Sequence, residues 1–75
     1  MKQRKTVEDY LKAVYLLQKQ NGSVRGADIA AELHVSRPTV SVSLKELEKE
    51  GYLFLDGARE VHLTDKGQTV ARETY

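Results

Sequence analysis

The sequence has no cysteine, and it has no apolar run that approaches the roughly 20 residues needed to span a bilayer. Without cysteine the chain can form neither a disulfide framework nor a thiolate metal site. The N-terminus also lacks the apolar segment of a signal peptide. We therefore expect a cytoplasmic protein that has no membrane partner.

The sequence also lacks a charge excess of either sign, because 12 Lys and Arg stand against 11 Asp and Glu and give a net charge of +1. The charges are spread unevenly. Residues 1–25 carry six basic and two acidic side chains, residues 26–50 carry three and five, and residues 51–75 carry three and four. The basic excess is therefore confined to the N-terminal third of the chain.

A chain of 75 residues forms one small domain, which buries only about 60% of the surface that its unfolded state exposes. Such a domain does not enclose an active-site cleft of ordinary size. The sequence shows no Ser–His–Asp set and no glycine-rich phosphate loop. We therefore expect that the protein is not an enzyme.

What the sequence does have is one clearly delimited segment, SRPTVSVSLKELEKEG, from Ser36 to Gly51. Ser36 predicts a helix start, because its hydroxyl can accept a hydrogen bond from an unpaired backbone N–H of the first turn. Pro38 is tolerated in that turn because its missing N–H has no intrahelical partner there. Gly51 can adopt the left-handed conformation that ends a helix. We predict a helix over residues 37–50.

This predicted helix has two different faces. One is apolar at helical spacing and defines a core face made of Val40, Leu44 and Leu47. The opposite face carries Pro38, Thr39, Val42, Lys45, Glu46 and Lys49. Its first part, from Ser36 to Ser43, is short-chained and nearly uncharged. A helix of this kind can approach a partner closely, and the bases in a DNA major groove are one such partner.

Three further helices are expected from apolar spacing and capping residues. The first covers about residues 7–20, with Thr6 as its N-cap and Asp9 three residues on in a capping-box arrangement. The second covers about residues 27–33, and the last covers about residues 65–75 after the N-cap Thr64. Residues 1–5 are expected to form a flexible basic tail.

The two central helices are joined by Leu33-His34-Val35-Ser36, which is the length that a helix-turn-helix needs. Ala30 is the small residue expected where the two helices cross. His34 occupies the turn position that usually requires a positive φ, and His is one of the few residues other than glycine enriched there. The pattern therefore predicts a helix-turn-helix.

Residues 52–55 and 60–63 are strand-like runs, and Asp56-Gly57-Ala58-Arg59 between them is a hairpin turn signal. Val24 is expected to add a third rung to this hairpin. A hairpin that follows a helix-turn-helix forms a wing. The predicted fold is mainly α with a small β-hairpin, a winged helix-turn-helix over residues 6–75.

The order of these elements favours DNA binding through the helix at residues 37–50. A winged helix that is used for protein contacts is the alternative, because a fold alone does not give a function. The histidines, His34 and His62, are expected to be solvated or partly packed, because no carboxylate is arranged at metal-ligand spacing around either of them.

Four segments follow a single family pattern: VEDYLKAVY (7–15), VRGADIA (24–30), VSRPTV (35–40) and LTDKG (63–67). In this combination the chain, from about Val7 to Tyr75, resembles the DNA-binding domain of the diphtheria-toxin-repressor family of metal-dependent regulators. That family includes iron-dependent repressors and manganese transport regulators. The resemblance implies a transcriptional repressor that controls metal-homeostasis genes. A metal-independent winged-helix regulator, or an interaction module of the same fold, is the alternative.

The resemblance also implies roles for individual residues. It implies that DNA bases are faced by Ser36, Pro38, Thr39 and Val42. It implies that Arg25, Arg37 and Ser41 lie near the DNA phosphates. Lys45 and Lys49, on the same exposed face, complete the expected set of contacts to double-stranded DNA.

The metal site that the resemblance implies is incomplete in this sequence. Asp9 matches a metal-ligand position of the manganese-type members, but Lys12 stands where those members have a glutamate ligand. An ammonium group cannot coordinate a cation. We therefore expect Mn²⁺ or Fe²⁺ in a full-length relative and no tightly bound ion in this chain alone.

The resemblance further implies a helical dimerisation domain after the winged helix in full-length relatives, with the metal bound between the two domains. Such a relative is expected to be a homodimer, and this chain a monomer or a weak dimer. The chain is either an excised domain or a pared-down relative.

Overall fold

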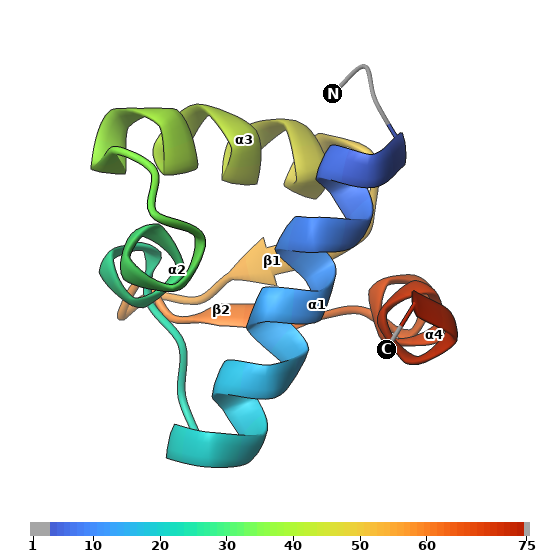
Figure 1. Cartoon of the computed structure of the whole chain (residues 1–75). Helices are drawn as coiled ribbons and strands as arrows, with labels where there is room; N and C mark the ends of the chain where they lie inside the picture. Colours follow the sequence, from blue (N-terminus) through green and yellow to red (C-terminus); the bar gives the residue numbers. More distant parts are fainter. Residues whose placement is uncertain (1–3, 75) are drawn as a thin grey trace.

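Four helices and a two-stranded hairpin form the computed structural model, which describes the backbone of residues 4–74 and the side chains of residues 6–73 (Figure 1). The elements are, in chain order, α1 (Arg4–Asn21), α2 (Gly26–Leu33), α3 (Arg37–Lys49), β1 (Leu53–Leu55), β2 (Val61–Leu63) and α4 (Asp65–Thr74). This architecture confirms the predicted winged helix-turn-helix. None of the helices in the described residues combines the length and apolarity that crossing a bilayer requires.

The first helix begins earlier than the sequence indicated. α1 starts at Arg4, so the predicted N-cap Thr6 lies inside the helix, and that prediction was wrong. Arg4 and Lys5 belong to α1 rather than to a tail, because Lys and Arg are good helix formers and no residue there stops the helix. Residues 1–3 of the predicted tail lie outside the described residues. The predicted end is confirmed, because Gly22 follows the helix with φ at 81°.

One apolar core holds all the elements together. α1 crosses the molecule and contacts α2, β2 and α4, while α3 lies along one edge and contacts α2 and β1 (Figure 1). The largest fully buried side chains come from every element except α4: Leu11, Val14, Val24, Ile29, Val40, Leu47, Leu53 and Val61. The predicted core face of α3 is confirmed, since Val40, Leu44 and Leu47 are all buried.

The turn between α2 and α3 adopts the predicted geometry. His34 has φ at 59° and ψ at 44°, the left-handed conformation that ends α2. The backbone N–H of Val35 donates to the carbonyl of Ala30 at 3.1 Å. Ser36 then caps α3, because its Oγ accepts a hydrogen bond from the Thr39 N–H at 3.3 Å. The direction in which α3 leaves α2 is therefore fixed by backbone hydrogen bonds.

The other end of α3 closes with a Schellman motif around Gly51, which has φ at 86°. The N–H of Tyr52 donates to the Leu47 carbonyl at 3.0 Å, and the N–H of Gly51 donates to the Glu48 carbonyl at 3.0 Å. Carbonyls that the helix end would leave unpaired are thereby satisfied. The chain turns directly from α3 into β1.

The wing is a short antiparallel hairpin in which Leu53 pairs with Leu63, Phe54 with His62, and Leu55 with Val61. Both strands begin one residue later than predicted, because Tyr52 and Glu60 each accept a single backbone hydrogen bond from the other arm and lie outside the paired register. The sheet has two strands. Val24 adds one backbone hydrogen bond to it, from the Val61 N–H to the Val24 carbonyl at 2.7 Å.

Thr64 joins the wing to both neighbouring helices. Its Oγ1 accepts a hydrogen bond from the Gly67 N–H at 3.1 Å, which confirms it as the cap of α4. The same hydroxyl lies 2.7 Å from the Gly51 carbonyl and 3.0 Å from the Tyr52 carbonyl, so it donates into the end of α3. The Thr64 N–H also donates to the Tyr52 carbonyl at 3.0 Å.

Gly67 is required because the backbone of Tyr52 lies against it. A Cβ added at Gly67 would stand 2.0 Å from the Tyr52 carbonyl oxygen, whereas a Cβ added at Gly57 would meet no heavy atom within 4 Å. We expect Gly67→Ala to destabilise the domain by about 3 kcal/mol, since the chain must shift to relieve the overlap. Gly57→Ala should change stability by less than about 0.5 kcal/mol. Thermal melting followed by circular dichroism measures both, and equal melting temperatures would refute the close approach.

Candidate nucleic-acid interface

The outer face of α3 is not covered by any other described element and lies along the upper edge of the molecule in Figure 1. Val42 near its centre is 59% exposed, more than any other large hydrophobic side chain in the described residues. The other side chains predicted for this face are exposed as well: Pro38, Thr39, Lys45 and Lys49. Ser43 is the exception, because it is only 8% exposed and belongs to the buried side.

The two hydroxyls at the start of α3 contact each other. Ser36 Oγ and Thr39 Oγ1 lie 2.8 Å apart, and either can be the donor. Both side chains are exposed, so one hydroxyl proton and the remaining lone pairs still face solvent. The pair can therefore cap the helix and offer hydrogen bonds to an external group at the same time.

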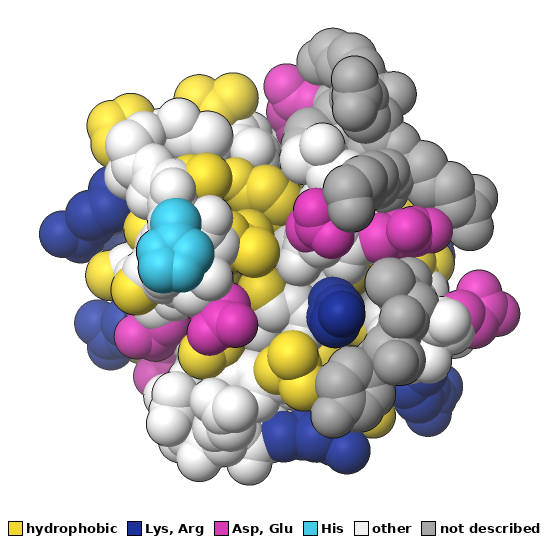
Figure 2. Space-filling model, in the orientation of Figure 1, with side chains coloured by type: hydrophobic (Ala, Val, Ile, Leu, Met, Phe, Trp, Pro, Cys, Tyr) yellow, Lys and Arg dark blue, Asp and Glu magenta, His cyan; other side chains and the backbone are white. Residues whose placement is uncertain are grey.

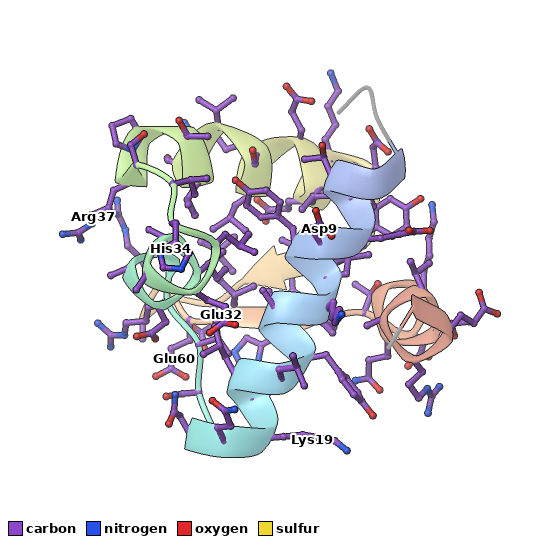
Figure 3. The ribbon with its side chains drawn as sticks, in the orientation of Figure 1. Asp9, Lys19, Glu32, His34, Arg37 and Glu60 are labelled. Atoms are coloured by element: carbon purple, nitrogen blue, oxygen red, sulfur yellow. The ribbon has the colours of Figure 1, made fainter. Side chains whose placement is uncertain are left out.

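A groove of about 550 Å³ runs between the N-terminal ends of α2 and α3 and the wing. Apolar side chains that include Val40, Leu44 and Leu55 form part of its lining. Ser41 lines it from α3, and three arginines from three different segments line it as well: Arg25, Arg37 and Arg59. Figure 3 shows Arg37 pointing outward from the start of α3. The groove is thus a basic channel beside the exposed face of α3.

Arg25 is held at its backbone, while its side chain is mostly exposed. Its N–H donates to the Asp28 carboxylate at 3.0 Å, which fixes the start of α2. The side chain is 60% exposed, and its Nη2 lies 4.0 Å from Oε2 of Glu60. An exposed ion pair at this distance contributes little. The guanidinium can therefore turn toward an anion in the groove at small cost.

Arg59 is the residue that the sequence analysis missed. It ends the hairpin turn with φ at 65°, where glycine is more usual, and its N–H donates to the Asp56 carbonyl at 3.0 Å. The signal was present, because Arg59 is the basic residue of the segment recognised as the hairpin turn. Its position in the groove follows only from the way in which the wing folds against α3.

The predicted metal ligand Asp9 lies elsewhere, in a hollow of about 190 Å³ between α1 and α2. Asp9, Lys12 and Glu32 line this hollow together with apolar side chains. Figure 2, which views the molecule from this side, shows acidic and basic side chains interspersed over this face, and Figure 3 labels Asp9 and Glu32 on the facing helices. Two carboxylates beside an ammonium group do not supply the several ligands that Mn²⁺ or Fe²⁺ needs. The described residues of this hollow therefore do not fit the implied metal.

Solved structures share this fold. The chain matches the Staphylococcus aureus transcription regulator MepR with a TM-score of 0.67 and 28% identity, covering 89% of this chain and 53% of that one. A MepR–DNA complex matches with a TM-score of 0.63 and 26% identity, covering 89% and 51%. The transcriptional regulator Tm0710 from Thermotoga maritima, at 24% identity and a TM-score of 0.69, covers 95% and 57% and shows the fold alone.

Relatives found by sequence identify the family more specifically than the solved structures do. The iron-dependent repressor IdeR of Mycobacterium tuberculosis (strain H37Rv) is 38% identical over 66 residues, which are 88% of this chain and 29% of the repressor. The transcriptional regulator MntR of Escherichia coli O157:H7 is 37% identical over 71 residues, which are 95% of this chain and 46% of the regulator. The chain thus spans less than half the length of these relatives. A family model described as the iron dependent repressor, N-terminal DNA binding domain, matches residues 3–61, and the chain belongs to that family.

Proposed function

We propose that the chain binds double-stranded DNA by placing α3 in the major groove, as the DNA-binding domain of a metal-dependent transcriptional repressor that controls metal-homeostasis genes. The observation that carries this proposal is the free outer face of α3 with Val42 exposed beside a groove lined by three arginines. An apolar side chain beside a groove lined by arginines suits a major groove, where thymine presents a methyl group and the backbone presents phosphates.

The two kinds of contact are supplied by different residues. Pro38 and Val42 offer apolar contacts to thymine methyl groups, and Ser36 and Thr39 offer hydroxyls to base edges. Phosphates on either side are contacted by the basic and hydroxyl side chains around the groove and along α3: Arg25, Arg37, Ser41, Lys45, Lys49 and Arg59. Only the first group reads sequence, because phosphates are the same at every base pair.

The number of base-reading side chains is small, so one copy should have modest specificity. Useful affinity requires two copies about one DNA turn apart, roughly 34 Å. In a full-length relative a homodimer supplies the second copy, whereas this chain alone is expected to be a monomer or a weak dimer. We place this activity in the cytoplasm, with the DNA.

The alternative is a metal-independent regulator of the same fold or a protein-interaction module. Salt dependence separates the interaction module from a DNA-binding domain, because each phosphate neutralised lowers the logarithm of the binding constant by about 0.9 per logarithmic unit of salt. An interaction module would show little binding to duplex at any salt concentration.

Arg59→Ala should weaken binding to every duplex alike and make the salt slope shallower by about 0.9, because one phosphate contact is lost. Fluorescence anisotropy with a labelled non-specific duplex over a series of salt concentrations measures the slope. Arg72→Ala is the matched control, since Arg72 is exposed on α4 away from the groove. Equal slopes for Arg59→Ala and the wild type would remove the wing from the interface.

Val42→Gln should change the preferred base at one position of a selected site, because a long amide can hydrogen-bond to adenine where valine favours a thymine methyl group. A panel of single base-pair substitutions, with affinities measured for both proteins, shows the change. Lys49→Ala is the control and should weaken all sites by a similar factor. If Val42→Gln leaves every preference unchanged, α3 does not read bases through this face.

Metal dependence is proposed for a full-length relative, with Mn²⁺ or Fe²⁺ as the ion, and not for the Asp9 hollow of this chain alone. Asp9→Asn should therefore leave Mn²⁺ binding by the chain unchanged in isothermal titration. Lys12→Glu replaces the ammonium with a second carboxylate on the same helix face. In that variant Mn²⁺ binding should become measurable and should depend on Asp9. A loss of Mn²⁺ affinity in Asp9→Asn alone would contradict this account.

A further inference from the structure

Three potential metal ligands meet on the wing. Asp56 follows β1, Glu60 precedes β2 and His62 lies within β2, and one ligand atom from each lies within 4.8 Å of the others. No other group of three such side chains lies this close within residues 6–73. The expectation that no carboxylate is arranged around His62 was therefore wrong. The hairpin brings these residues together from both of its arms.

The separation of the first two ligands already matches a coordination sphere. Nε2 of His62 lies 2.8 Å from Oδ2 of Asp56. Metal–ligand distances of about 2.0–2.2 Å place neighbouring ligands roughly 3 Å apart at tetrahedral or octahedral angles. An ion at that distance from both atoms would lie to one side of the line that joins them, so the two side chains need only turn to direct their lone pairs at it.

Both of these ligands are held in position before any ion binds. Oδ1 of Asp56 accepts hydrogen bonds from the N–H groups of Ala58 at 2.9 Å and Glu60 at 3.0 Å, which leaves Oδ2 directed at His62. The His62 ring stacks on Phe54, with centroids 5.2 Å apart and planes at 23°. Ligands that are already ordered bind more tightly, because less side-chain freedom is lost.

The protonation state also suits a cation. The hydrogen bond with His62, and after it the hydrogen bond from the Glu60 N–H, lower the pKa of Asp56 below its ordinary value of 3.8. The Asp56 carboxylate is therefore ionised at neutral pH and has no proton to lose. Two ionised carboxylates carry two negative charges, which a divalent ion compensates.

The simpler reading is that Asp56 and His62 only stabilise the turn. Glu60 is not needed for that role, and its other charged neighbour is the exposed Arg25 at 4.0 Å. The side chains of Asp56 and His62 are each 36% exposed. An ion can therefore enter from solvent and keep waters in its remaining coordination positions.

We propose that Asp56, Glu60 and His62 form a binding site for a divalent first-row transition-metal ion of the zinc type. One imidazole nitrogen and two carboxylate oxygens favour Zn²⁺, Ni²⁺ or Co²⁺ over Mg²⁺ and Ca²⁺, which take oxygen ligands. This site is separate from the Asp9 hollow. The expectation that the chain binds no ion tightly therefore applies only to that hollow. It does not rest on DNA binding.

Two consequences follow for the wing. The ion links Asp56, which follows β1, to Glu60 and His62 on the other arm of the hairpin. Binding therefore stabilises the folded hairpin and raises the melting temperature of the domain. Glu60 also turns toward the ion and away from Arg25. The guanidinium of Arg25 then has no acidic partner at the groove.

The test is isothermal titration of the 75-residue chain with Zn²⁺ in a non-chelating buffer, together with melting curves with and without Zn²⁺. The wild type should bind one ion and melt at a higher temperature when it is bound. His62→Gln and Glu60→Gln should each weaken binding by at least about tenfold, and should remove the shift in melting temperature. His34→Gln and Asp9→Asn are the matched controls and should bind as the wild type does.

Mg²⁺ should neither bind nor compete in the same titration. Melting curves without metal show whether each variant is folded. If His62→Gln is unfolded, Glu60→Gln alone tests the site. The proposal is overturned if the wild type shows no binding, if Glu60→Gln binds as the wild type does, or if His34→Gln or Asp9→Asn abolishes binding. DNA affinity measured without metal tests the proposed function separately.

Discussion

The burial of one face of α3 is the constraint on which the rest of the structure depends. Val40, Leu44 and Leu47 are at most 4% exposed and pack into the single core that a chain of 75 residues can form. A domain of this size has no second layer with which to cover the opposite side of the helix. The contact that stabilises α3 therefore also leaves Val42 and its neighbours exposed. Fold stability and the presentation of a binding surface have the same physical cause.

Features that depend on near neighbours in sequence could be predicted. Ser36 caps the residues directly after it, Gly51 ends the helix directly before it, and His34 adopts its conformation within one turn. The predicted start of α1 was wrong for a related reason. Thr6 is favourable as a cap but is also tolerated inside a helix. Because Arg4 and Lys5 before it are good helix formers, the cap residue alone did not determine where α1 begins.

Features that depend on the register of the hairpin could not be predicted. His62 lies opposite Phe54 and beside Asp56 only because Leu53 pairs with Leu63. A slip of one residue would turn His62 to the other face of the wing. The place of Arg59 in the groove depends in the same way on the packing of the wing beside α3. The exposed face of α3 could thus be predicted, while the arginine from the wing could not.

In the proposed complex DNA lies against α3 and the groove, although the net charge of +1 gives no indication of such a partner. The arrangement of charge matters more than its sum, because contacts to phosphate are local. The most direct measurement is a map of backbone amide chemical-shift changes when a short duplex is added at low salt. The account predicts that the changes concentrate in residues 36–42 and at Arg25 and Arg59. Changes concentrated on α4, or no changes at all, would contradict it.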